Sequence, residues 1–234
     1  MSLIDLRREL KSLASPEKAK LLQGFFKTGK GQYGEGDVFL GIVVPVQRSV
    51  AKKHLELSFG DLQKLMDSKI HEERLVALMI LVLKQRKATE SEKSEMFEFY
   101  MKNYDNINNW DLVDLSAPNV IGSYLIDKDK KILYEFAKSS HLWKKRISIL
   151  STFYFIKNNQ FEDSLKIAEI LLNDKHDLIH KAVGWMLREI GKRNLKVEEG
   201  FLKKYYKKMP RTMLRYAIEK FEEVKRKEYL NGEI

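Results

Sequence analysis

The chain contains no cysteine, so disulfides, thiolate metal sites, cysteine nucleophiles and cysteine-ligated iron–sulfur clusters are all excluded. No run of about 18 apolar residues is present, which argues against a membrane span. The N-terminus lacks the continuous apolar core of a secretory signal, because charged residues such as Asp5 and Arg7 interrupt it. These absences predict an intracellular, cytoplasmic protein with no membrane partner.

Patterns that would indicate a metal site or a serine nucleophile are also missing. The five histidines are His54, His71, His141, His176 and His180. Only the last two are spaced as on one helix face, and no carboxylate or third histidine accompanies them, so we expect surface residues rather than zinc ligands. No serine lies in a Gly-x-Ser-x-Gly elbow. We therefore expect no metal and no cofactor.

Half of the twelve glycines lie between Gly24 and Gly41. The centre of this Gly-rich segment, 29–37, is predicted to be a loop. A phosphate-binding loop would be followed by Gly-Lys-Ser/Thr at the start of a helix, and that sequence is absent. A loop that closes over a partner is therefore favoured over a nucleotide site.

Positive charge is in excess and is unevenly distributed. The 43 Lys and Arg residues outnumber the 33 Asp and Glu residues, which gives a net charge of +10. No carboxylate lies between Glu17 and Glu35 or between Glu135 and Glu162, although several lysines do. Such local excesses indicate a polyanionic partner, nucleic acid first. The alternative is a solvated basic surface without a specific partner.

The apolar pattern predicts helices throughout, with a repeat that begins at Phe59. Before it, we expect one helix over 3–13 and a second that starts at Ser15-Pro16-Glu17. The repeat consists of helical pairs that begin about 31 to 36 residues apart: 61–68 with 71–86, 92–103 with 109–126, 128–139 with 141–157, 162–173 with 177–191, and 198–208 with 210–229. Compact residues recur in the second helices at Ala77, Val113, Ser148, Ala182 and Ala217.

Two helices per repeat predict an all-α solenoid of stacked antiparallel hairpins. We expect one domain over 1–234, with N-terminal helices and the Gly-rich loop in 1–58 and the repeats in 59–230. The second helices would line one concave face, which would be basic and suited to a nucleic-acid backbone. That face would carry Arg74, Trp110, Asp114, Lys144, Lys145, Arg146, Lys181, Trp185, Arg188 and Arg215.

The first candidate for chemistry is Asp114. A helix capped by Asn108 or Asn109 would place Trp110 and Asp114 one turn apart on the same face. In a cationic groove a lone carboxylate repels a polyanion, so its plausible purpose is to stabilise positive charge that develops during a reaction. The alternative is a structural aspartate that satisfies a helix end or pairs with Arg146.

Trp185 is the second tryptophan of interest. It follows Gly184, which is unfavourable inside a helix by about 1 kcal/mol relative to alanine unless another element approaches closely. Trp110 and Trp185 belong to repeats two apart and could flank one point of the groove. Trp143 is expected to pack in the core instead.

Together these residues resemble the DNA alkylation repair (AlkD-like) glycosylases, a family with HEAT-like repeats, over most of the chain. The matching motifs are Trp110-x-x-x-Asp114 with Pro118 and Gly122, Trp143-x-x-Arg146, Gly184-Trp185-x-x-Arg188-Glu189, Gly31-Gln32-Tyr33-Gly34, and Phe39-Leu40-Gly41-Ile42-x-x-Pro45-x-x-Arg48.

The resemblance implies hydrolysis of the N-glycosidic bond of cationic N3- and N7-alkylated purines in duplex DNA, in the nucleoid if the source is bacterial. It implies Asp114 as the catalytic carboxylate and Trp110 and Trp185 as the aromatic flank. The DNA-binding residues would be Arg146, Lys145, Arg188, Lys181, Arg48 and Tyr33. The enzyme would be monofunctional, because no lysine is singled out for Schiff-base chemistry, and would need no obligate protein partner.

The sequence departs from the family at two positions and leaves two other functions open. Asn109 stands where some relatives carry a second tryptophan, and Val43 stands where some are polar. A non-catalytic nucleic-acid-binding repeat protein would share the basic charge, and it would bind DNA but leave its bases intact. A protein scaffold would have no affinity for DNA at moderate salt.

Overall fold

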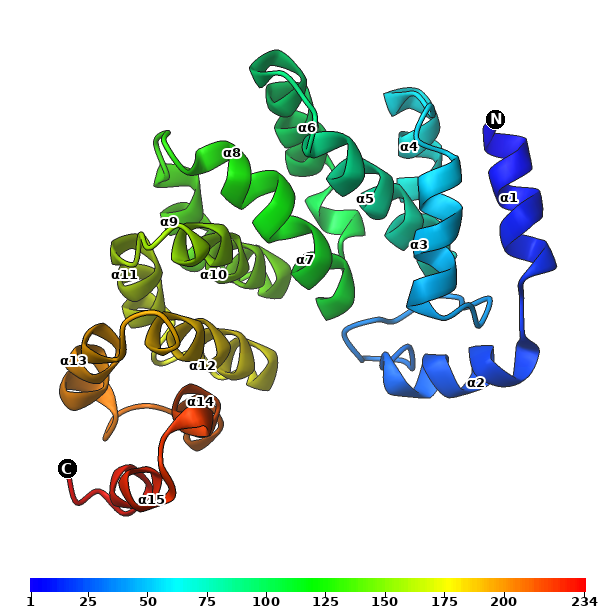
Figure 1. The fold of residues 1–234 in the computed structure, drawn as a ribbon. Helices are drawn as coiled ribbons and strands as arrows, with labels where there is room; N and C mark the ends of the chain where they lie inside the picture. The colour runs from blue at the N-terminus through cyan, green and yellow to red at the C-terminus, as the bar shows by residue number, and fades with distance from the viewer. The chain divides into compact units, whose positions relative to one another are not determined.

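The computed structural model describes residues 1–234, and its regular elements are helices apart from one isolated bridge between Val38 and Ile70. The all-α prediction is therefore confirmed. The chain forms two compact units, unit 1 (Met1–Val120) and unit 2 (Ile121–Ile234), whose helices are labelled in Figure 1. None of these helices combines the length and the apolar character needed to cross a membrane.

Unit 1 is built around one buried helix, α5, which packs against α3, α4, α6 and α7. Every α5 side chain from His71 to Val82 is buried. The helices of the unit are α1 (Leu3–Ser12), α2 (Pro16–Phe25), α3 (Val44–Lys53), α4 (Phe59–Met66), α5 (His71–Gln85), α6 (Glu90–Lys102) and α7 (Trp110–Ala117), with a 3-10 turn at Tyr104–Asn106.

Local sequence explains where several of these helices begin. Ser2 and Thr89 form capping boxes with residues three positions later at the starts of α1 and α6. α2 has a proline in its first turn, as predicted. α3 also has a proline in its first turn, Pro45, and it begins at Val44. The Gly-rich segment is irregular, as expected.

Unit 2 consists of helical hairpins that follow a π-helical segment, Pro118–Gly122, and the short helix α8 (Ser123–Leu125). α10 packs against α9, α11 and α12, and α12 packs against α13 and α14. The remaining helices are α9 (Lys131–Ala137), α10 (Leu142–Lys157), α11 (Glu162–Ile170), α12 (Asp177–Gly191), α13 (Leu195–Tyr205), α14 (Arg211–Ala217) and α15 (Glu223–Asn231).

The hairpin pattern holds in both units, with one exception. The predicted second helices 71–86, 141–157 and 177–191 match α5, α10 and α12 closely. The five compact residues that marked the repeat are all buried. The single helix predicted over 210–229 is wrong: α14 ends at Ala217, a 3-10 turn covers Ile218–Lys220, and Phe221 is extended.

The break at Phe221 has a packing reason. It allows α15 to turn back, so that Tyr229 becomes buried between the rings of Tyr206 and Phe221, with centroids 5.3 and 5.6 Å away. Both ring pairs are edge-to-face, a favourable aromatic geometry. A continuous helix would leave that tyrosine without these neighbours. The organisation of residues 1–234 as one domain stays a prediction, and the two compact units are described separately.

Candidate functional site

The start of α7 is tied to the end of α2 through Asn109, which is fully buried. Its side-chain oxygen accepts the N–H of Trp110 at 2.9 Å, and its amide nitrogen donates to the Phe26 carbonyl at 3.3 Å. The predicted cap is thus confirmed at Asn109. A tryptophan at position 109, as in some relatives, could not make these two hydrogen bonds, which explains the asparagine in structural terms.

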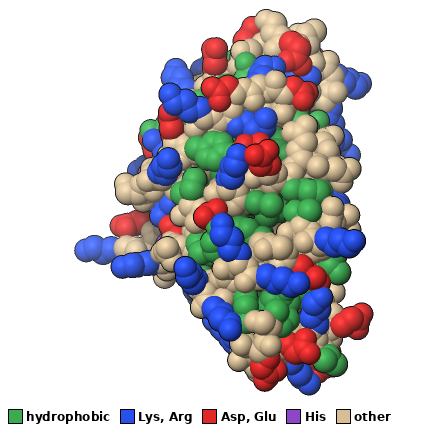
Figure 2. Space-filling model, turned by 90° about the vertical axis from the view of Figure 1, so that its left-hand side faces the viewer, with side chains coloured by type: hydrophobic (Ala, Val, Ile, Leu, Met, Phe, Trp, Pro, Cys, Tyr) green, Lys and Arg blue, Asp and Glu red, His purple; other side chains and the backbone are tan.

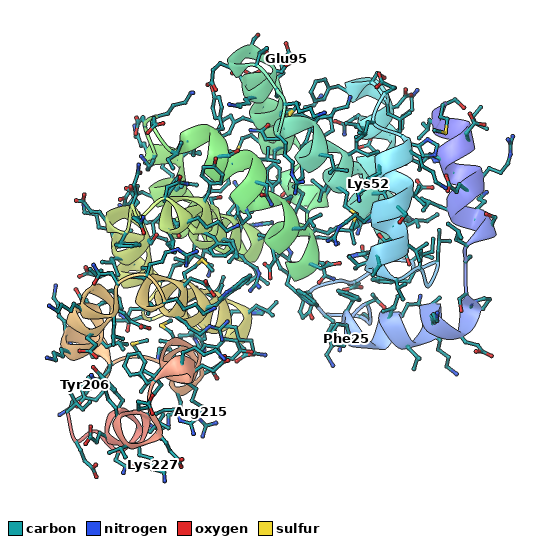
Figure 3. The ribbon with its side chains drawn as sticks, in the orientation of Figure 1. Phe25, Lys52, Glu95, Tyr206, Arg215 and Lys227 are labelled. Atoms are coloured by element: carbon teal, nitrogen blue, oxygen red, sulfur yellow. The ribbon has the colours of Figure 1, made fainter.

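Trp110 is half-buried and lies against two phenylalanines that the sequence analysis did not select. The Phe26 ring stacks on the indole with a centroid distance of 5.3 Å and an interplanar angle of 17°. The Phe25 ring meets it edge-on at 5.9 Å and is 62% exposed (Figure 3). We call these three rings the aromatic surface of unit 1. The only sequence signal for it was the Phe-Phe pair at the end of α2.

Asp114 lies one turn further along α7 and is also half-buried. It is close to Tyr100, whose hydroxyl lies 3.0 Å from the Ser116 hydroxyl. Burial raises the pKa of Tyr100 well above its ordinary value, the Ser116 bond opposes the shift, and the negative charge of Asp114 adds to it. Asp114 therefore has a neutral hydroxyl nearby and a half-buried indole one turn before it.

A charged cluster, formed by Asp37, His71, Arg74 and Asp111, lies behind the aromatic surface. The two ring nitrogens of His71 lie 3.0 Å from Asp37 Oδ2 and 2.8 Å from Asp111 Oδ2. Arg74 lies 2.6 Å from the same Asp37 oxygen. Burial raises the pKa of Asp37, but the bonds from His71, Arg74 and Asn108 outweigh it, so the pKa stays below its usual value.

The Gly-rich segment is held against unit 1 by a second carboxylate, Glu72. Its two oxygens accept the backbone N–H groups of Leu40, Gly41 and Ile42 at 2.9, 2.8 and 3.2 Å. Glu72 is fully buried, so these are charge-assisted bonds shielded from water. The segment is therefore a fixed part of unit 1 in this structure.

Two residues that are predicted to contact DNA belong to unit 1. Arg48 is exposed on α3 and has no ion pair. Tyr33 is half-buried in the Gly-rich segment. Val43, the apolar departure from the family pattern, is 43% exposed immediately before α3.

In unit 2, Trp185 is half-buried on α12 and is oriented by Glu189. The indole N–H donates to Glu189 Oε1 at 3.2 Å, and the Phe153 ring lies 5.6 Å away. Burial raises the pKa of Glu189, but bonds from Lys192 and Trp185 outweigh it and lower the pKa. The Lys157 ammonium lies 4.3 Å from the centroid of the Phe153 ring, a distance within the range of a cation–π contact.

Gly184 confirms that another element approaches α12 closely. A Cβ atom there would overlap the Met213 carbonyl oxygen and lie 2.5 Å from Tyr216 Cβ, both from α14. Glycine is therefore required for the contact between these helices, and its position next to Trp185 follows from packing. Trp143 is 5% exposed, which confirms that it belongs to the core.

Four of the predicted cations of unit 2 have internal partners, and Arg215 does not. Arg146 is buried and donates to the Leu178 carbonyl at 2.5 Å. Lys145 pairs with Asp174 at 2.5 Å, Lys181 pairs with Asp177 at 2.7 Å, and Arg188 pairs with Glu219. Arg215, labelled in Figure 3, is exposed without an ion pair. Figure 2 shows lysine and arginine side chains spread among carboxylates and apolar groups on one face.

The histidines differ from expectation in burial. His176 caps α12 by accepting the Leu178 N–H at 3.1 Å, and His180 lies 2.5 Å from the Asp174 carbonyl, so both are half-buried helix-end residues. His54 and His71 are 1% exposed. Sequence spacing offered no signal for this burial.

Comparison with known proteins agrees with this architecture. A family model described as "DNA alkylation repair enzyme" matches residues 6–221. A solved structure, a predicted DNA alkylation repair enzyme from Enterococcus faecalis, is 17% identical and superposes with a TM-score of 0.70 over 90% of this chain and 97% of that one. No curated protein matches. The helical pairs thus form the solenoid-like repeat fold of this family, and the chain belongs to the DNA alkylation repair enzymes.

Proposed function

We propose that the protein is a monofunctional DNA glycosylase that hydrolyses the N-glycosidic bond of cationic N3- and N7-alkylated purines in duplex DNA. Membership in the DNA alkylation repair family implies DNA as the substrate. The observation that supports the finer proposal is the position of Asp114, one turn after the half-buried indole of Trp110 and its two phenylalanine neighbours.

The protein needs to provide little activation of the leaving group, because the alkylated base is already a good leaving group. An alkylated purine carries a positive charge, and as the glycosidic bond breaks its electron pair neutralises the departing base. The sugar then carries the positive charge, which a nearby carboxylate stabilises more in the transition state than in the ground state. Asp114 supplies that charge and orients a water whose oxygen bonds to C1′ while it releases a proton.

The aromatic rings supply selectivity in this proposal. The face of an indole attracts a cation by about 0.5 to 2 kcal/mol, so a cationic base gains over a neutral one. In unit 1 the rings are Trp110 and Phe25, and in unit 2 the ring is Trp185. No base-reading pocket is needed, because neutral bases lack both this attraction and a labile bond.

The test is release of 7-methylguanine and 3-methyladenine from methylated duplex DNA. Asp114→Asn keeps the side-chain shape and is expected to slow release about 100-fold or more, the usual cost of losing one electrostatic stabiliser. Asp67→Asn, at an exposed carboxylate that ends α4, is the matched control and should be unchanged. Equal rates for Asp114→Asn and wild type would remove Asp114 from the mechanism.

Two further outcomes separate the alternatives. No release by either protein, together with tight and salt-sensitive binding of intact DNA, would identify a non-catalytic binder. Strand cleavage by β-elimination in a purified sample would contradict the monofunctional assignment.

A further inference from the structure

His71 is the first residue of α5 and is 1% exposed, yet both of its ring nitrogens face a carboxylate. Nδ1 faces Asp37, from the Gly-rich segment, and Nε2 faces Asp111, from the first turn of α7. Each carboxylate also accepts a hydrogen bond through its other oxygen: Asn108 donates to Asp37 at 3.0 Å, and the Leu112 N–H donates to Asp111 at 2.9 Å. Both oxygens of each carboxylate therefore face hydrogen-bonding groups.

This arrangement favours a ring that is protonated at both nitrogens. A neutral imidazole has one N–H donor and one acceptor nitrogen, and an ionised carboxylate can only accept. Both contacts are therefore hydrogen bonds only when His71 is an imidazolium. Arg74, 2.6 Å from Asp37 Oδ2, reinforces the ionised state of that carboxylate.

The ring is also part of the aromatic stack under Trp110. Its centroid lies 4.4 Å from Phe39, nearly parallel, and 5.2 Å from Phe26. Phe26 stacks in turn on Phe39 at 5.1 Å and on Trp110 at 5.3 Å. One buried cation is thus joined to the Gly-rich segment, to α7 and to the ring on which the Trp110 indole rests.

We propose that His71 is a positioning residue for Trp110: as an imidazolium it clamps Asp37 to Asp111 and thereby holds Phe26 against the indole. When the ring loses a proton, one carboxylate loses its hydrogen bond from His71, so the ring no longer joins the Gly-rich segment to α7. The clamp is a property of unit 1, and only its consequence for catalysis rests on the proposed glycosylase activity.

The direction of the pH dependence follows from the groups around the ring. Asp37 faces it from the Gly-rich segment, Asp111 from α7 and Arg74 from α5. Burial and Arg74 lower the pKa of His71, but the bonds to Asp111 and Asp37 outweigh them and raise the pKa above 6.5. The clamp's contribution to stability is therefore complete below pH 6.5 and is lost as the pH rises through the folded pKa.

The test uses the full chain without DNA. In protein labelled with 15N-histidine, both ring nitrogens of His71 are expected to be protonated at pH 6.5. In protein labelled with 5-fluorotryptophan, the 19F resonance of Trp110, assigned with Trp110→Phe, should shift at alkaline pH with the same midpoint as His71. A neutral His71 tautomer at pH 6.5 would overturn the proposal, and so would a Trp110 resonance that does not follow the titration.

Variants separate positioning from general stability. Asp111→Asn is expected to lower the pKa of His71 by about one unit or more and to move the Trp110 midpoint equally, which a merely structural role would not do. His71→Asn should abolish the pH response of Trp110. His54→Asn is the matched control, because His54 is equally buried in unit 1 but bonds to Glu9 at 3.0 Å, and it should leave the response intact.

Each outcome decides the proposal without an activity assay. If His71→Asn does not fold, the wild-type and Asp111→Asn titrations still test the linked midpoints. If no base is released from methylated DNA, the clamp proposal is unaffected, and if the midpoints differ, the glycosylase proposal is unaffected.

Discussion

Glu198 on α13 is buried as a carboxylic acid, and replacing it with glutamine should stabilise the protein at neutral pH. Its side chain is 1% exposed, and Oε1 has no hydrogen-bond partner. Gly191 lies directly against the carboxyl group, where any side chain would overlap it. Burial raises the pKa of Glu198 to about 8, with a further contribution from the charge of Glu199 and an opposing one from Arg188.

The size of the effect follows from the two pKa values. In the unfolded chain the group returns to its ordinary pKa of 4.5, so folding takes up a proton between pH 4.5 and 8. The contribution of Glu198 to the stability of the wild type is therefore most favourable below pH 4.5, and it falls by about 1.4 kcal/mol for each pH unit up to the folded pKa. At pH 7 the loss amounts to about 3 kcal/mol. Glu198→Gln keeps the neutral shape without this loss.

The assay is urea unfolding at several pH values between 4.5 and 8, followed by far-UV circular dichroism. The advantage of Glu198→Gln over wild type should grow from its value at pH 4.5 by about 3 kcal/mol at pH 7. Glu162→Gln is the control, because Glu162 is exposed in the same unit and ion-paired with Lys166, and its difference from wild type should stay nearly constant over this pH range. A pH-independent difference for Glu198→Gln would refute the reasoning.

Two other predictions concern the packing and the charge of unit 2. Gly184→Ala should lower the free energy of unfolding by about 1 to 3 kcal/mol, because the new Cβ atom would overlap the Met213 carbonyl oxygen. Gly200→Ala should raise the free energy of unfolding by up to about 1 kcal/mol, because no atom lies within 4 Å of the new Cβ atom. Equal effects of the two variants in urea titrations would contradict the packing argument. Arg215→Ala should reduce the slope of the logarithm of the duplex-DNA binding constant against the logarithm of salt concentration by about 0.9. Arg188→Ala should reduce this slope by clearly less, because Arg188 is already ion-paired within its unit. Equal slopes for the two variants would show that the internal ion pair does not affect DNA binding.

The helices were predictable because their packing repeats an apolar pattern with the helical period. α10 and α12 have nearly the bounds that the spacing indicates, and the compact residues at their contacts mark the repeat. The last hairpin was not predictable in this way. Its pattern continues through Phe221, and only the packing of Tyr229 against Tyr206 decides that the chain turns there.

The candidate site was predictable only where it depends on one helix. Trp110 and Asp114 share a face because they are four residues apart on α7. Phe25 and His71 reach the same place from other elements, and no spacing in the sequence encodes that meeting. Internal ion pairs such as Lys145 with Asp174 were equally hidden, because the sequence shows a cation but not its partner.

Trp110 in unit 1 and Trp185 in unit 2 are each linked to a carboxylate of their own unit. In unit 2, Glu189 accepts the Trp185 indole N–H directly, and in unit 1, Asp111 acts on Trp110 through His71 and Phe26. The attraction between a cation and an indole, about 1 kcal/mol, depends on where the cation lies over the ring. If the ring were mobile, the cation would spend less time over its face and the attraction would be weaker. A fixed ring therefore improves the discrimination between cationic and neutral bases more than it improves the affinity for DNA.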